Sequence, residues 1–180
     1  MSKNLSDLFR KFKHETETLW SKKTISSSKW GWQIQTGTKW LPGHTNSERD
    51  ELIQSAKITN INKDLYELLF FTKGLNLPQM HVNIEPTKRY LQQWKLSLEY
   101  IQKQWPKEKP EVPEKGIKEL VGNDYEILPI FAHRYIVLGE DWLKVLSVWS
   151  NDDTIVYGDN LQEYLKHEFL SKSLVSSSFQ

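Results

Sequence analysis

The sequence predicts an α+β fold with helices packed against an antiparallel sheet, and three features of the 180-residue chain indicate it. The first half carries apolar residues at the three-to-four-residue spacing of amphipathic helices. From Tyr125 the hydrophobic period changes to two, which is typical of strands, and a last helical stretch follows. Because these elements are segregated along the chain, we expect the sheet to form from the C-terminal half.

The first predicted element is an amphipathic helix over residues 4–20. Its apolar positions recur at spacings of three and four, and they are Leu5, Leu8, Phe9, Phe12, Thr16 and Leu19. Such a face docks either on its own domain or on a partner. We therefore assign residues 1–24 to an N-terminal helical segment that fulfils one of these two roles.

A short strand and two helices are expected next. Residues 30–34 alternate large apolar with small or polar side chains, as a strand does. A helix over 47–57 has Ser47 as its N-cap, with Asp50 three residues later as an imperfect capping box. A second helix over 62–73 precedes Gly74, which stands where a left-handed C-terminal cap belongs.

A third helix is predicted over residues 87–105. It has an apolar stripe at three-four spacing that comprises Leu91, Trp94, Leu98, Ile101 and Trp105. Pro106 ends this helix, because proline lacks the N–H that a helix interior needs. The charged, Pro-rich residues 106–116 then form an internal linker without core content.

The C-terminal half predicts strands and a closing helix. Residues 126–139 indicate two strands or one bent strand. Residues 143–150 indicate a central strand with two apolar faces, one of them carrying Val145, Ser147 and Trp149. A polar Asn-Asp-Asp turn leads into a hairpin partner at 154–158. Asp159 or Asn160 caps the last helix. Residues 25–170 are expected to form a single domain, with 171–180 as a frayed tail.

Composition excludes several classes of function. The 24 basic and 23 acidic residues leave a net charge of +1, so the basic footprint of a nucleic-acid-binding protein is absent. No cysteine is present, which excludes disulfides and thiolate metal sites and suits a cytoplasmic protein. No run of about 18 apolar residues occurs, so we expect no membrane-spanning segment.

Reactive side chains are too dispersed to predict an enzyme. The five histidines form no His-x-x-x-His pair, so we expect no metal site. No Gly-x-Ser-x-Gly elbow and no phosphate-cradling glycine loop occur. We therefore predict no catalytic residues, no cofactor and no small-molecule substrate.

Tryptophan is the unusual component of the chain, with eight residues. Trp30, Trp32 and Trp40 lie within eleven positions, where they form a protein-binding platform, a sugar-stacking face or part of the core. Trp142 follows Glu140 and Asp141 in a polar turn and is our candidate for an exposed ring. The two carboxylates would supply rim charges for a basic partner.

Two segments resemble the SUKH superfamily. The stretch INKDLYELLFFTKG is similar to its helical signature, matching at Ile61, Asp64, Leu68, Leu69 and Gly74 and departing at Asn62, Leu65 and Lys73. Residues 126–169 resemble its sheet and closing helix, and WGWQIQTGTKWLPG resembles the lead-in of bacterial members. The resemblance implies an α+β fold and a binding role. Bacterial members look like immunity proteins against polymorphic toxins, and a fungal member regulates cell-wall synthesis as an interaction hub.

We therefore expect a non-enzymatic immunity protein that neutralises a toxin domain by direct binding. The candidate contacts are Trp30, Trp32, Trp40, Glu140, Asp141 and Trp142. A regulatory scaffold that binds several partners, through the N-terminal helix or the helix at 87–105, is the first alternative. A carbohydrate-binding module built on the paired Trp rings is the second.

Overall fold

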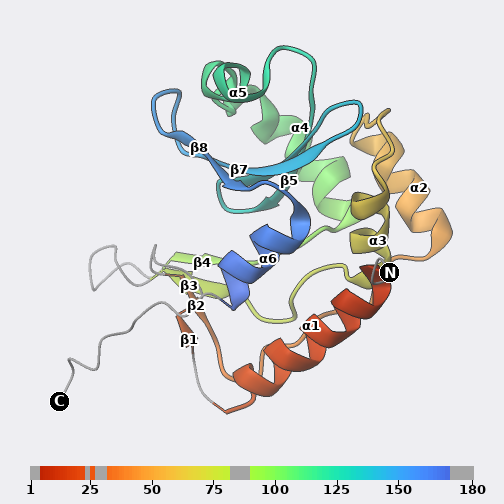
Figure 1. Ribbon diagram of the computed structural model, residues 1–180, viewed down its shortest axis with the longest axis vertical. Coiled ribbons are helices and arrows are strands. Elements are labelled where there is room, and N and C mark those ends of the chain that lie inside the picture. The colour runs from red at the N-terminus through yellow and green to blue at the C-terminus, as the bar shows by residue number, and fades with distance from the viewer. Residues whose placement is uncertain (1–4, 23–24, 27–31, 82–89, 171–180) are drawn as a thin grey trace.

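The computed structural model describes residues 5–22, 25–26, 32–81 and 90–170. For residues 25, 26 and 90 it describes the backbone only. Two four-stranded antiparallel sheets, with strand orders β1-β2-β3-β4 and β5-β6-β7-β8, combine with six α-helices (Figure 1). The predicted α+β class is therefore confirmed. Within these residues no helix is long and apolar enough to cross a membrane.

The first sheet comes from the N-terminal half, where only one strand was predicted. Its strands are β1 (Ile25–Ser26), β2 (Trp32–Ile34), β3 (Gln79–His81) and β4 (Tyr90–Gln92). Around them lie α1 (Leu5–Trp20), α2 (Asn46–Ser55) and α3 (Lys63–Phe71). The second sheet comprises β5 (Glu126–Phe131), β6 (Arg134–Leu138), β7 (Leu143–Val148) and β8 (Thr154–Gly158). Helix α6 (Leu161–Phe169) lies between the two sheets (Figure 1).

An aromatic cluster centred on Trp40 joins α1 to the rest of the chain. The Trp40 ring has five aromatic neighbours with centroids 5.0–5.8 Å away, namely Phe12, Trp20, Phe71, Trp94 and Phe169. Its indole N–H donates to Thr16 Oγ1 at 2.9 Å. The apolar face of α1 is thus buried against its own chain, and each ring removes roughly 150–250 Å² from water.

The predicted helix over 87–105 is wrong in its first half: residues 98–105 are helical, residues 90–96 are not, and 87–89 lie outside the described residues. Residues 90–96 are extended because they bond to neighbouring strands and loops: Leu75 N–H donates to the Trp94 carbonyl, and Leu96 N–H to the Lys73 carbonyl, both at 2.9 Å. Leu91, expected to face inward, is 59% exposed. The three-four spacing is therefore helical only for Leu98, Ile101 and Trp105, and tertiary hydrogen bonding overrides it over residues 90–96.

The predicted linker over 106–116 is also wrong. A π-helical turn (Tyr100–Gln104) runs into α4 (Trp105–Glu108), a 3₁₀ turn (Lys109–Glu111) and α5 (Glu114–Val121). Pro106 lies in the first turn of α4, where its missing N–H is tolerated. Gly116 is buried, and a Cβ there would lie 2.4 Å from Thr154 Oγ1, so α5 packs closely on β8.

Two predicted caps are placed differently. Thr45, rather than Ser47, caps α2 and forms a full capping box with Glu48. Gly74 is not a helix cap, since α3 ends at Phe71 and Thr72 is extended. Gly74 has a φ of 136°, and a Cβ there would approach the Trp94 carbonyl to 2.5 Å, so glycine is required for this close strand contact.

Candidate partner-binding site

The predicted tryptophan platform is buried. Trp32 is 5% exposed and Trp40 4% exposed, and Trp30 lies outside the described residues. The Trp32 ring contacts Phe131 edge-on, with centroids 4.8 Å apart, and Trp40 fills the aromatic cluster. Trp32 and Trp40 are therefore wrong as contact residues, and these two rings form no sugar-stacking face.

The turn between β6 and β7 leaves its carboxylates exposed and draws its tryptophan inward. Glu140 and Asp141 are exposed, as predicted for rim charges. Trp142 is half-buried and packs on the core, because Gly139 has no side chain. A Cβ on Gly139 would lie 2.1 Å from the Trp142 ring. Trp142 as the exposed ring is therefore wrong, and the glycine three residues before it was the available signal.

The exposed ring belongs to Trp149, in the turn between β7 and β8. Its side chain is 66% exposed, the most of any described aromatic residue. Sequence periodicity placed it correctly on the face of Ser147, but β7 ends at Val148, so the ring projects beyond the sheet. The signal that could have found it is its position next to the Asn-Asp-Asp turn.

Hydrogen bonds fix this turn in place. Trp149 N–H donates to the Asp153 carbonyl at 3.0 Å, and Asp153 N–H donates to Ser150 Oγ at 3.1 Å. The Thr154 hydroxyl donates to the Ser150 carbonyl at 2.7 Å. The turn is therefore built before any partner arrives, which limits the entropy lost on binding.

A buried polar cluster supports Trp149 from below. The ring meets His133 edge-on with centroids 5.1 Å apart, and His133 Nε2 accepts from the Arg134 guanidinium. Arg134 is buried, donates to Ser147 Oγ at 2.9 Å, and lies 3.4 Å from a carboxylate oxygen of Glu168 on α6. The guanidinium also stacks 3.9 Å over the Tyr157 ring. Trp149 thus stands on a packed, fixed base.

The electrostatics of this base keep His133 uncharged. Burial, and then the positive charge of Arg134, lower the pKa of His133 to about 4. A neutral imidazole at pH 7 suits its role as acceptor for Arg134. Burial raises the pKa of Glu168, and the guanidinium opposes that rise.

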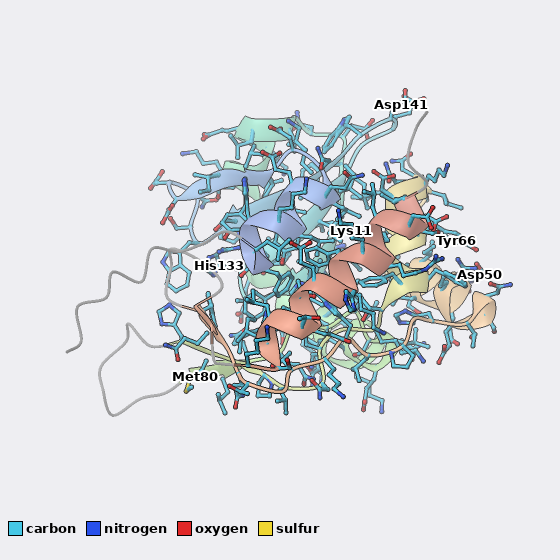
Figure 2. All side chains as sticks on the ribbon, turned by 60° about the horizontal axis from the view of Figure 1, so that its bottom comes forward. Lys11, Asp50, Tyr66, Met80, His133 and Asp141 are labelled. Atoms are coloured by element: carbon cyan, nitrogen blue, oxygen red, sulfur yellow. The ribbon has the colours of Figure 1, made fainter. Side chains whose placement is uncertain are left out.

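Around Trp149 lie exposed apolar and acidic side chains, and together they form what we call the hairpin surface: Trp149, Asp152, Asp153 and Ile155. The register that pairs Ser147 with Ile155 places Ile155 on the same face as Trp149. Neither Asp152 nor Asp153 forms an ion pair with a described residue. Figure 2 shows His133, beneath this surface, far from Asp141 in the other turn.

A second surface lies between α1 and α3. A groove of about 240 Å³ is lined by Phe9, Phe70 and Phe71, with Arg10 and Lys13 at its rim. Phe70 is 58% exposed, and the Arg49 guanidinium stacks over the rings of Tyr66 and Phe70 at 3.9 and 5.1 Å. Figure 2 shows Tyr66 and Asp50 at this side of the molecule, with α1 crossing in front. We call this the α1–α3 groove.

The other hollows are polar. One of about 350 Å³ lies between α5 and β5, where Lys118 pairs with Glu114. Another of about 360 Å³ lies between β4 and β5, where the Lys95 ammonium sits over the Tyr100 ring. In the described part of the chain no three His, Asp or Glu residues gather as metal ligands would.

Comparison with known proteins adds no relatives: no family model, no curated protein and no solved structure matches this chain.

Proposed function

We propose that this protein is an immunity-type protein that binds a bacterial toxin domain through the hairpin surface and neutralises it by covering its active site. The observation that carries the proposal is the exposed Trp149 ring on a pre-formed turn. Such neutralisation is steric and electrostatic, and it needs an interface of about 1,200–2,000 Å² in total. The SUKH resemblance in the sequence points to the same class.

Trp149 suits the role of central anchor. Tryptophan is enriched among the residues that contribute most to binding, because a large ring is buried with few rotatable bonds to order. Its contact with His133 already restricts the ring. Ile155 extends the apolar surface beside it, as residues around an anchor do when they exclude water but contribute little binding energy.

The charges favour a basic partner. Asp152 and Asp153 are exposed and unpaired with any described residue, so both are available to cations on a toxin. Complementary charges at an interface rim mainly raise the rate of association. Nucleic-acid-cleaving toxin domains have basic surfaces of this kind, because their substrate is a polyanion.

The test is a pull-down with wild-type protein and matched variants against the product of the adjacent gene, which the proposal expects to be the toxin. Trp149→Ala should abolish recovery of the toxin, and the charge reversal Asp152→Lys/Asp153→Lys should reduce it. The control Glu140→Lys/Asp141→Lys reverses the same number of charges at the other end of β7 and should bind as wild type. Equal recovery by all variants, with folding verified by circular dichroism, would refute the proposal.

The α1–α3 groove favours a second candidate function, that of a scaffold with two binding surfaces. Exposed Phe70 beside Arg49 matches the aromatic and arginine composition of interface hot spots. Arg10 and Lys13 at the rim suit an acidic segment with one apolar anchor side chain. A Phe70→Ser variant that loses one partner while keeping the toxin would establish the scaffold role. A Phe70→Ser variant that keeps every partner would exclude the scaffold role.

A further inference from the structure

We infer that the outer edge of β8 receives an extended segment of the partner as an additional strand, so that backbone hydrogen bonds supplement the Trp149 anchor. This inference rests on the proposed function and specifies how the hairpin surface binds. Because β8 is the last strand in the order β5-β6-β7-β8, no strand of the described residues pairs with its outer edge. Free edges are templates for strand addition.

The hydrogen-bond pattern shows which backbone groups face that edge. Val148 N–H donates to the His133 carbonyl, so the backbone of Val148 faces β6. Trp149 N–H donates to the Asp153 carbonyl, so the backbone of Trp149 faces β8. In an antiparallel pair these directions alternate residue by residue. Ile155, two residues after Asp153, therefore bonds to β7 through its partner Ser147. Thr154 and Val156 then point their N–H and C=O groups outward.

The edge has an irregularity at Tyr157, where the β7–β8 register shifts, but before that residue it lacks the charge and proline that usually protect an edge strand. Proteins block such strands with lysine, proline, inward charges or a covering element. The strand sequence Thr-Ile-Val-Tyr-Gly has neither charge nor proline, and Ile155 and Val156 are both exposed. Helix α5 packs near Thr154, and the Tyr157 carbonyl is held by His167, which leaves Val156 as the centre of the open stretch. An apolar, uncharged edge next to an exposed tryptophan is what strand addition requires.

The occupant is a cationic, extended segment of the partner. Asp152 and Asp153 stand at the start of the free edge, so a strand laid along β8 would bring side chains from one of its ends close to both carboxylates. Pairing of β8 with a second copy of this chain would gain no such charge complement from the turns.

The experiment uses amide exchange measured by NMR on the full chain with a synthetic probe, acetyl-Lys-Val-Lys-Val-Thr-Lys-amide at millimolar concentration. We expect exchange of the Thr154 and Val156 amides to slow by about tenfold or more when the probe binds, because each gains a backbone acceptor. An acidic peptide with Glu for Lys, and a probe N-methylated at alternate residues, should leave both amides unchanged.

Two single proline substitutions, at neighbouring positions of β8, serve as matched variants. Val156→Pro removes an N–H that faces outward, so the sheet should stay folded and probe binding should be lost. Ile155→Pro removes a ladder bond to β7 and should destabilise the fold instead. If Val156→Pro binds the probe as wild type does, strand addition is wrong.

The remaining outcomes separate this inference from the proposed function. If the probe shifts Trp149 and the carboxylates without slowing either amide, or does not bind at all, strand addition is overturned while the pull-down still decides the proposed function. If both amides are protected without probe in a concentration-dependent oligomer, the occupant is a second copy and the inference is also overturned. Slowed exchange together with a failed pull-down would support strand addition and refute the toxin as the partner.

Discussion

The turns at the two ends of β7 contain the same residue types, one tryptophan and two carboxylates, but hold the tryptophan in opposite ways. In the β6–β7 turn Trp142 folds back over Gly139 and packs on the core. In the β7–β8 turn Trp149 projects into solvent, and among the rings that the structure describes it meets that of His133 alone. The carboxylates are exposed in both turns.

The difference shows that a neighbouring residue, rather than local composition, decides whether a tryptophan is available for binding. Gly139 offers a flat surface on which a ring can lie, since any larger side chain would collide with it. The β7–β8 turn has no glycine, and its hydrogen bonds to Ser150 set the chain so that Trp149 points away from the sheet.

The largest predicted effect comes from removing the support beneath Trp149. Glu168→Ala leaves the buried Arg134 charge without its carboxylate and should lower the free energy of unfolding by about 3–5 kcal/mol. Urea denaturation followed by circular dichroism measures this. The double variant Arg134→Met/Glu168→Leu should recover most of the loss, and a double variant as unstable as Glu168→Ala would contradict this account of the pair.

Replacing each of the two tryptophans by alanine in turn tests the comparison between the two turns directly. Trp149→Ala should weaken toxin binding by about 2–4 kcal/mol while changing the free energy of unfolding by less than about 0.5 kcal/mol. Trp142→Ala should show the reverse, with a clear loss of stability and unchanged affinity once folded. Isothermal titration and urea denaturation on the same preparations separate the two effects.

The glycine explanation predicts that Gly139→Val forces the Trp142 ring off its surface. Overpacking of this kind lowers stability by about 1–3 kcal/mol. The emission of Trp142, recorded in a variant whose other tryptophans are replaced where the fold tolerates it, should shift to longer wavelength. Tolerance of Gly139→Val with no change in stability would mean that the ring does not depend on the glycine.

His133 makes the β7–β8 end sensitive to acid. Its pKa is about 6.5 when unfolded and about 4 when folded, so between these values the unfolded chain binds more protons. Stability should therefore fall as pH drops from about 6.5 to about 4, by roughly 1 kcal/mol after allowance for the exposed part of the ring. His133→Gln should flatten this dependence. His44, whose pKa burial also lowers, contributes to the remaining slope, and so does Glu48, whose pKa the bond to Lys73 lowers to about 2.

The smallest effect is that of the rim charges. Asp152→Asn/Asp153→Asn should slow association with the toxin and weaken binding by about 0.2–1 kcal/mol, mostly at low salt. Glu140→Gln/Asp141→Asn should leave the association rate unchanged. Stopped-flow measurements at two salt concentrations distinguish the two ends of β7.

The C-terminal sheet could be predicted from the sequence because its strands are joined by short turns and alternate clearly up to α6. The first sheet could not, because β2 and β3 are three residues long and lie far apart in sequence. Helix α5 was hidden in a charged, Pro-rich stretch whose buried residues, Gly116 and Ile117, are few.

The exposed tryptophan was predicted in kind and misplaced in position. The predicted pattern, a tryptophan beside two carboxylates in a turn of the C-terminal sheet, fits both ends of β7. Only the contact between Gly139 and the Trp142 ring, which depends on three-dimensional packing, selects Trp149.

One measurement tests the central claim, that the exposed Trp149 turn is the surface that neutralises a toxin. Cells expressing the toxin domain encoded beside this gene are supplied with wild-type protein, Trp149→Ala or Trp142→Phe, each at equal soluble levels. The account predicts that wild type and Trp142→Phe restore growth and that Trp149→Ala does not. Growth restored equally by Trp149→Ala would contradict it.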